Sequence, residues 1–363
     1  MMIGVLGGGQ LGRMLALAGY PLGHTFRFFD PSIEAPASHL ADLIAGDYGD
    51  SSQVERFAEG LDVLTYEFEN VPFSTVQFLE KRLPIYPSAK ALEISQDRLK
   101  EKTLFKALDI PTTQFFRIDS RKNLEEAIKE TGYPSVLKTR YSGYDGKGQC
   151  IIRAPHDFDE AWQKIGKGPL LLEGWVPFER ELSVISVRGR NGETQFYPII
   201  ENHHREGILR TSFAPADNSA GLLQEKAERY AAKILETFQY VGVLTIEFFQ
   251  KNGELIANEI APRVHNSGHW TIEGAETSQF ENHLRAITGL PLGSTAAIGY
   301  SSMVNLIGEL PEPSSLLHVS CAHLHLYGKD LRPNRKIGHI TVRNNDKKIV
   351  RERTEKIIQL LKE

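Results

Sequence analysis

The fold is indicated first by residues 133–153, which read YPSVLKTRYSGYDGKGQCIIR. An apolar strand ends at Lys138, and a second apolar strand follows the glycines. Between the strands, Gly143, Gly146 and Gly148 give a flexible flap whose backbone N–H groups can wrap around a polyphosphate. The lysine adds a positive charge for the same phosphates. The segment predicts a nucleotide-phosphate hairpin, although an ordinary glycine-rich hairpin has the same composition.

A second predicted hairpin, residues 243–259, turns at Asn252-Gly253 and carries Glu247 and Glu259 toward its open end. Two carboxylates, completed by phosphate oxygens and water, are ligands that Mg²⁺ prefers when it bridges a nucleotide. The register decides whether they meet. A regular two-residue loop would send Glu259 to the face opposite Glu247, because side chains alternate along a strand. The metal hypothesis therefore requires an odd-length loop or a bulge.

The N-terminal segment contains Gly7-x-Gly9-x-x-Gly12 between a predicted strand and a predicted helix, with Asp30 after the next strand. This arrangement is typical of dinucleotide-binding units. The physical inference from this motif is narrower than a dinucleotide site, because the glycines only let a backbone approach a phosphate at a helix N-terminus. A nicotinamide cofactor, another phosphorylated ligand and a merely tight turn all stay open at this point. An oxidoreductase would leave the flap and the two glutamates without a role.

Alternating strands and helices over residues 2–86 predict a parallel sheet with helices on both faces. Residues 88–108 are expected to be helical, and long strands over 170–262 are expected to form a mainly antiparallel sheet with one helix at 220–238. A final segment, 301–363, should contain strands, a basic turn and an amphipathic helix. Three packed lobes are therefore expected in the chain.

The composition of the 363 residues excludes several classes of protein. A net charge of -4 and a pI near 6.3 argue against a nucleic-acid partner, which usually needs a basic surface. The two cysteines, Cys150 and Cys321, have no metal-ligand spacing and suit a reducing compartment. No targeting segment or membrane-spanning run is recognisable. A cytoplasmic enzyme acting on small molecules is the expectation.

Two further segments suit a ligase site. Glu173-Gly174-Trp175-Val176 follows a buried strand and is typical of a connector that hydrogen-bonds an adenine, although its carboxylate could also be a solvated surface acid. Polar side chains then gather directly after Glu259. Arg263, His265, Asn266 and His269 there suggest a clamp for the substrate and the transition state.

Taken in order, these motifs resemble the N5-carboxyaminoimidazole ribonucleotide synthetases of purine biosynthesis, a family of the ATP-grasp superfamily. The most specific string is NEIAPRVHNSGHW at 258–270. Asn334 stands where many relatives have glycine, which bears on the geometry of its turn. The other matching strings are GGGQLGRM at 7–14, DRL at 97–99, GYDGKG at 143–148 and RPNRKIGH at 332–339.

The resemblance implies an ATP-grasp fold in which ATP, bicarbonate and 5-aminoimidazole ribonucleotide give the N-carboxylated ribonucleotide, ADP and phosphate through carboxyphosphate. It implies a Rossmann-like N-terminal domain at 1–100, a lid domain at 101–172 and a catalytic domain with a substrate-binding subdomain at 173–363. It also implies a homodimer. Other ATP-grasp ligases that activate a different carboxylate, such as a formate-using transformylase or a biotin carboxylase, are the nearest alternatives.

The resemblance also implies the residues of each site. Mg²⁺, which Mn²⁺ can replace, is expected on Glu247 and Glu259. Catalytic roles are expected for Lys138, Asp145, Arg263, His265 and Asn266. ATP is expected at Arg98, Lys138, Gly143, Tyr144, Asp145, Gly146, Lys147, Gly148, Gln149, Glu173, Gly174, Trp175, Val176, Glu181, His204, Asn258 and Glu259. The ribonucleotide and bicarbonate are expected at Gly9, Gln10, Leu11, Glu67, Tyr144, Asp145, Arg263, His265, Asn266, Lys329 and Arg335.

Overall fold

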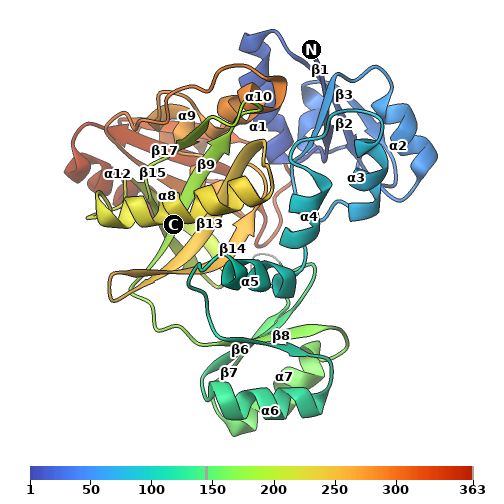
Figure 1. Cartoon of the computed structure of the whole chain (residues 1–363). Coiled ribbons are helices and arrows are strands. Elements are labelled where there is room, and N and C mark those ends of the chain that lie inside the picture. Colours follow the sequence, from blue (N-terminus) through green and yellow to red (C-terminus); the bar gives the residue numbers. More distant parts are fainter. Residues whose placement is uncertain (144–145, 362–363) are drawn as a thin grey trace.

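The structure is a computed structural model that describes residues 1–143 and 146–361. Its strands form three sheets (Figure 1). The N-terminal sheet is parallel, in the order β3-β2-β1-β4, which confirms the parallel sheet expected there. Its elements are β1 (Met2–Leu6), α1 (Gln10–Gly19), η1 (Tyr20–Leu22), β2 (Thr25–Asp30), η2 (Pro36–His39), β3 (Asp42–Ala45), α2 (Ser51–Ala58), β4 (Val63–Tyr66) and α3 (Phe73–Glu80).

The helical segment that links this domain to the next is divided into α4 (Ala89–Ser95) and α5 (Arg98–Ala107). The break falls at Asp97, whose backbone is extended, with φ -120° and ψ 106°. Its carboxylate accepts a hydrogen bond from the Leu99 N–H at 3.0 Å, and so caps α5. The expectation of helical structure over 88–108 is confirmed except at this cap.

A small domain projects away from the rest of the molecule (Figure 1). Its antiparallel sheet has the order β5-β8-β6-β7. Lys138 lies opposite Gln149, which confirms the hairpin predicted on either side of the glycines. The last strand ends at Gly174, two residues beyond the proposed boundary at 172, and that boundary stays a prediction. The elements are β5 (Phe115–Ile118), α6 (Arg121–Thr131), β6 (Ser135–Thr139), β7 (Gln149–Ile152), η3 (Pro155–Asp157), α7 (Phe158–Ile165) and β8 (Leu170–Gly174).

The largest sheet has nine strands in the order β14-β13-β9-β11-β12-β15-β17-β16, with β10 beside β9. All of its pairs are antiparallel, as expected. The elements are β9 (Arg180–Arg188), β10 (Thr194–Phe196), β11 (Ile200–Arg205), β12 (Ile208–Ala214), α8 (Leu222–Thr237), β13 (Gly242–Lys251), β14 (Glu254–Ala261), η4 (Asn266–Gly268), α9 (Thr271–Gly274), α10 (Gln279–Thr288), β15 (Tyr300–Ile307), α11 (Pro313–Leu317), β16 (Ala322–Leu326), β17 (Lys336–Asn344) and α12 (Lys347–Leu360).

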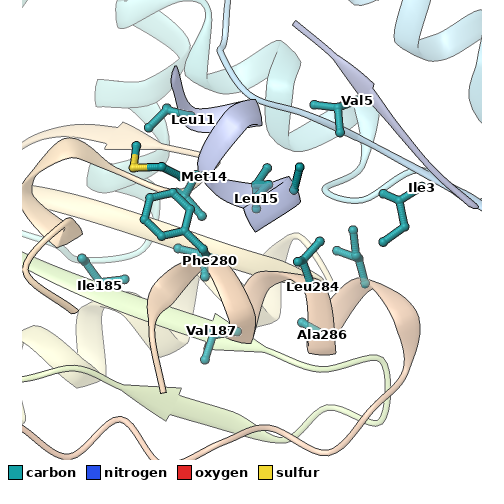
Figure 2. Packing of buried hydrophobic residues seen from close by; sticks show 14 of the residues in the cluster. Ile3, Val5, Leu11, Met14, Leu15, Ile185, Val187, Phe280, Leu284 and Ala286 are labelled. Atoms are coloured by element: carbon teal, nitrogen blue, oxygen red, sulfur yellow. The ribbon is translucent and has the colours of Figure 1, made fainter. Parts of the chain in front are cut away.

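The N-terminal domain and the large sheet share one hydrophobic core. Figure 2 shows Met14 and Leu15 of α1 beside Phe280 and Leu284 of α10, and all four side chains are buried. Burial of this apolar surface stabilises the contact between the domains. The two domains therefore present a fixed floor, against which the small domain is placed. Among the described residues, none of the helices is both long and apolar enough to cross a membrane.

Candidate active site

The turn of the β13–β14 hairpin has two residues. Lys251 lies opposite Glu254, and only Asn252 and Gly253 separate them. Both turn residues have positive φ, 51° and 73°, as a type I′ hairpin turn requires. The loop is therefore even, and by itself it would place the two predicted metal ligands on opposite faces.

A β-bulge farther along the hairpin reverses that outcome. Moving away from the turn, Phe248 of β13 lies opposite Ala257 of β14. The neighbouring residue of β13, Glu247, then lies opposite Glu259 and not opposite Asn258. Asn258 is therefore the extra residue of β14, and the side chains beyond it change faces. The carboxylates of Glu247 and Glu259 thus lie side by side on one face, which satisfies the condition set by the sequence.

A histidine and an arginine side chain contact the two carboxylates. His265 Nε2 lies 3.2 Å from Glu247 Oε1, and Arg98 Nη1 lies 3.0 Å from Glu259 Oε2. Burial opposes ionisation of Glu247. The hydrogen bond and charge of His265, with the charge of His204, outweigh burial and lower the pKa of Glu247 to about 2. Glu247 is therefore an anion at neutral pH.

The donor set suits a metal that is shared with a nucleotide. Among residues 1–143 and 146–361, no group of three or more His, Cys, Asp or Glu side chains could hold a metal ion alone. Mg²⁺ is commonly held by only one or two carboxylates, with phosphate oxygens and water completing its shell. The buried Oδ1 of Asn258 has no hydrogen-bond partner among the described residues and belongs to the same cleft. Glu247, Glu259 and their surroundings therefore fit Mg²⁺.

A cleft of about 490 Å³ lies over this face of the hairpin. Its lining comes from the small and the large sheet, from α1 and α5, and from the segment after β4, so the cleft is assembled only by the tertiary structure. Tyr144 and Asp145, two of the expected site residues, lie outside the described residues. The expected residues that line the cleft are Gln10, Leu11, Arg98, Lys138, Gly143, Gly146, Lys147, Gln149, Glu181, His204, Glu247, Asn258, Glu259, Arg263, His265 and Asn266.

The flap lysine is paired with a buried carboxylate. Lys138 Nζ donates to Glu173 Oε2 at 3.0 Å, and Lys102 Nζ lies 3.4 Å from the same oxygen. Burial opposes ionisation of Glu173, but the charges of Lys102 and Lys138 outweigh it and lower its pKa to about 2. Glu173 Oε1 is buried and has no hydrogen-bond partner within residues 1–143 and 146–361, and could accept a hydrogen bond from a ligand amino group. Lys102 was not expected in the site. Lys102 lies four residues after Arg98 and therefore on the same face of a helix, and this spacing could have identified it from the sequence.

Glu181 and His204 form a pair at another wall of the cleft. His204 Nδ1 lies 2.9 Å from Glu181 Oε2. Burial lowers the pKa of the imidazole, but the hydrogen bond to Glu181 and the charge of Glu247 outweigh burial, so the His204 pKa is raised. The pair therefore offers both a carboxylate acceptor and an imidazole donor toward a bound nucleotide.

Arg263 binds a carboxylate that was not assigned from the sequence. Its guanidinium makes a bidentate pair with Glu69, in which Nη2 donates to Oε1 at 2.8 Å and Nε donates to Oε2. Glu69 and Arg263 both line the cleft. Glu69 follows the end of β4, and the carboxyl ends of parallel strands commonly border ligand sites. That placement is a signal which could have identified it.

Glu67, the nearby carboxylate that was expected in the substrate pocket, lies beneath the glycine turn instead of in the cleft lining. Its Oε2 accepts the Gly12 N–H at 2.6 Å, and its Oε1 accepts the Gly9 N–H. A side chain at Gly9 would collide with this carboxylate. Because these glycines have no side chains, the turn has room for the Glu67 carboxylate. The Gly9 N–H already donates its hydrogen bond to that carboxylate. Burial raises the pKa of Glu67. The substrate roles expected for Gly9 and Glu67 stay predictions.

The basic turn approaches the same end of α1. Lys329 Nζ donates to Gln10 Oε1, and Lys336 lines the cleft. Asn334 has φ +60°, a left-handed conformation in which glycine and asparagine are favoured. Arg335 Nη1 donates to the Asp330 carbonyl oxygen at 3.4 Å, and a third of its side chain is exposed. Cations from residues 329–336 and the start of α1 thus lie together, although Lys329 and Arg335 do not belong to the cleft lining.

Three family models match successive parts of the chain. They describe a ribonucleotide synthetase preATP-grasp domain (residues 1–96), an ATP-grasp domain (103–280) and a phosphoribosylaminoimidazole carboxylase C-terminal domain (301–353). The boundaries of the family models differ from those of the three sheets, because the ATP-grasp model spans the small domain and much of the large sheet.

Known proteins are similar over the whole chain. The N5-carboxyaminoimidazole ribonucleotide synthase of Pseudomonas aeruginosa is 51% identical, over 99% of both chains. The crystal structure of N5-carboxyaminoimidazole ribonucleotide synthetase from Thermus thermophilus is 57% identical, with a TM-score of 0.96 over 100% of this chain and 99% of that one. The Aspergillus clavatus synthase, solved with ADP and 5-aminoimidazole ribonucleotide, is 31% identical, with a TM-score of 0.93 over 99% and 98%.

Proposed function

The chain belongs to the N5-carboxyaminoimidazole ribonucleotide synthase family of ATP-grasp ligases, and we propose that its cleft joins bicarbonate to an aminoimidazole ribonucleotide. It is an ATP-dependent carbon–nitrogen ligase of purine biosynthesis. The observation that carries the proposal is the bulge in β14, which pairs Glu247 with Glu259 on the face that forms the cleft floor.

ATP is placed between the small domain and the large sheet. Lys138, the flap and Arg98 bind its phosphates, while Glu181 and His204 lie within the same cleft for its ribose. The connector at 173–176 borders the adenine, whose amino group can donate to the unpartnered Glu173 Oε1. Mg²⁺ held by Glu247 and Glu259 would neutralise charge on the phosphates when it is bound.

The first reaction step joins bicarbonate to the γ-phosphorus of ATP. A bicarbonate oxygen forms the new O–P bond, the bond from the γ-phosphorus to the bridging oxygen breaks, and ADP leaves with the electron pair. The approach brings anions together, so the cations of Lys138, Arg98 and Arg263 offset the repulsion. Arg263 is held in place for this by Glu69. The product of the step is carboxyphosphate.

In the second step, the exocyclic amine of 5-aminoimidazole ribonucleotide attacks the carboxyl carbon. The C–N bond forms, the C–O bond to phosphate breaks, and the amine loses a proton. Carboxyphosphate reacts readily with water, so the flap over residues 143–148 has to exclude solvent during this step. No covalent enzyme intermediate is required. His265 and Asn266 border the cleft where the aminoimidazole is placed.

Phosphate release tests the proposed activity. Purified protein with ATP and bicarbonate should release phosphate when 5-aminoimidazole ribonucleotide is added, without any nicotinamide cofactor. Formate in place of bicarbonate, or biotin in place of the ribonucleotide, should give only background release. A rate that does not depend on the ribonucleotide would contradict the assignment.

The ribonucleotide phosphate is assigned to the basic turn and the start of α1. Lys329→Ala combined with Arg335→Ala should raise the KM for 5-aminoimidazole ribonucleotide by about 100-fold, because each lost charge-assisted hydrogen bond costs roughly 1.5–3 kcal/mol. The KM for ATP should change by less than about threefold. Steady-state kinetics with each substrate varied separately measures both. Arg332→Ala, at an exposed position of the same turn, is the matched control, and equal losses for the two substrates would refute this division of the cleft.

The setting of the enzyme is part of the proposal. We place it in the cytoplasm, because both cysteines are free thiols and because its substrates are small metabolites. We also propose the homodimer that the family resemblance implies. Sedimentation equilibrium of the intact chain tests the dimer, and a monomer at micromolar concentration would contradict it.

A further inference from the structure

Among the described residues, one side of β14, the strand that carries Glu259, pairs with no other strand and makes only an isolated bridge, between Ala257 and Thr112. β14 stands at the end of the nine-stranded order, so half of its backbone groups point away from β13. Such an edge leaves N–H and C=O groups that need other partners. Here α5 and the segment after it provide those partners: both contact β14 before the bulge, and α5 also contacts it after the bulge.

Before the bulge, the partners meet at Ala257. Its N–H donates to the Pro111 carbonyl at 2.7 Å, and its own carbonyl accepts from Thr112 Oγ1 at 2.8 Å and from Lys102 Nζ at 3.3 Å. After the bulge, the Ile260 N–H donates to Glu101 Oε1 at 2.6 Å. Both Ala257 and Ile260 therefore point their amides outward.

The direction of these two amides shows which register β14 adopts against β13. Along a regular strand the N–H groups alternate, so outward amides are separated by an even number of residues. Ala257 and Ile260 are three residues apart, and both can point outward only if one residue between them is extra. That residue is Asn258. In a regular ladder the Ile260 amide would turn toward β13, and Glu259 would face away from Glu247.

We infer that Glu101 is a positioning residue: by accepting the outward Ile260 amide, it selects the bulged register that places Glu259 opposite Glu247. Glu101 is 2% exposed, and burial, with the charge of Glu259, raises its pKa to about 8. Its carboxyl group therefore lies there at the expense of its hydration and requires hydrogen-bond partners. The same helix carries Arg98, whose guanidinium holds the Glu259 carboxylate. α5 thus fixes both the backbone and the side chain of one metal ligand.

The role of Glu101 rests on the proposed metal function of Glu247 and Glu259, so the test has two separate readouts. The first is hydrogen exchange of the Ile260 amide in the nucleotide-free, metal-free protein. The second is Mn²⁺ affinity in the presence of ADP, measured by electron paramagnetic resonance. In Glu101→Leu, which keeps the bulk but removes the acceptor, exchange should be about 10- to 100-fold faster and Mn²⁺ binding about 10-fold weaker.

The conservative variant Glu101→Gln tests whether position 101 has to supply a hydrogen-bond acceptor or a negative charge. Glu101→Gln keeps an oxygen for the Ile260 amide and should restore slow exchange and most of the Mn²⁺ affinity. The matched control is Glu273→Leu, which removes a mostly buried carboxylate that pairs with His325 outside the cleft. It should leave the Ile260 amide protected. If Glu101→Leu does not fold, Glu101→Asp, whose carboxylate is one methylene too short, should show the same faster exchange.

The results of these measurements distinguish the positioning role of Glu101 from the metal assignment of Glu247 and Glu259. An Ile260 amide that stays protected in Glu101→Leu and Glu101→Asp would overturn the positioning role. Equal loss in Glu101→Gln would also overturn it, because an uncharged acceptor would then be insufficient. If wild-type protein with ADP bound no Mn²⁺, the metal assignment itself would fail, and amide exchange would still decide whether Glu101 holds the bulge.

Discussion

Replacing Glu259 with Gln is expected to lower turnover by about 1,000-fold, equivalent to roughly 4 kcal/mol of transition-state stabilisation. The amide keeps the shape of the side chain but removes the anionic oxygen that faces the nucleotide phosphates. Glu247→Gln should have an effect of similar size, since the two residues lie directly opposite each other. The measurement is phosphate release at saturating substrates over a range of Mg²⁺ concentrations.

Glu254→Gln is the matched control for these variants. It stands at the other end of β14, is more than half exposed and pairs with Lys226 on the surface. Such a pair contributes little, so the control should retain near wild-type turnover and stability. The circular dichroism spectra of all three variants should agree. Near-normal turnover in Glu259→Gln or Glu247→Gln would remove the metal assignment.

The second large effect is expected at Arg263. In Arg263→Met the Glu69 carboxylate loses its bidentate partner. Breaking a buried pair from one side costs about 3–5 kcal/mol, and the low end applies here because 29% of the Glu69 side chain is exposed. Turnover should also fall by about 100- to 1,000-fold, because a preorganised cation of the cleft is lost. Urea unfolding and phosphate release measure the two losses.

A double variant separates stability from catalysis. Arg263→Met with Glu69→Leu removes both charges, so most of the lost free energy of unfolding should return. Turnover should stay as low as in Arg263→Met alone. Recovery of turnover together with stability would show that Arg263 serves the fold and has no part in the chemistry.

The same pair predicts a pH dependence. Burial opposes ionisation of Glu69, but the charge and hydrogen bond of Arg263 outweigh it and lower the Glu69 pKa to about 2. A carboxyl whose pKa is lower in the folded protein stabilises it above the unfolded pKa and loses this contribution as pH falls. Between about pH 5 and 3, wild type should therefore lose more free energy of unfolding than the double variant. Parallel curves would contradict the pairing.

The sequence by itself determined the type of the elements that carry the main motifs and the chemistry available to them. The glycines at 143–148 favour a chain reversal, so the two strands of the hairpin on either side of them could be read directly. The alternation of strands and helices over 2–86 likewise fixed a parallel sheet, because periodicity is a local property. The resemblance of residues 258–270 to one family added the reaction.

Only the tertiary structure decided which of these groups meet. The turn at Asn252-Gly253 predicts an even loop, and the bulge at Asn258 that corrects it is held by contacts from α5, more than 150 residues away along the chain. Glu67 and Glu69 are both acids near the end of one strand, yet one lies beneath the glycine turn and the other binds Arg263. Their roles depend on which partners the packing brings within hydrogen-bonding distance. No local pattern encodes those distances, because they are set by elements remote in sequence.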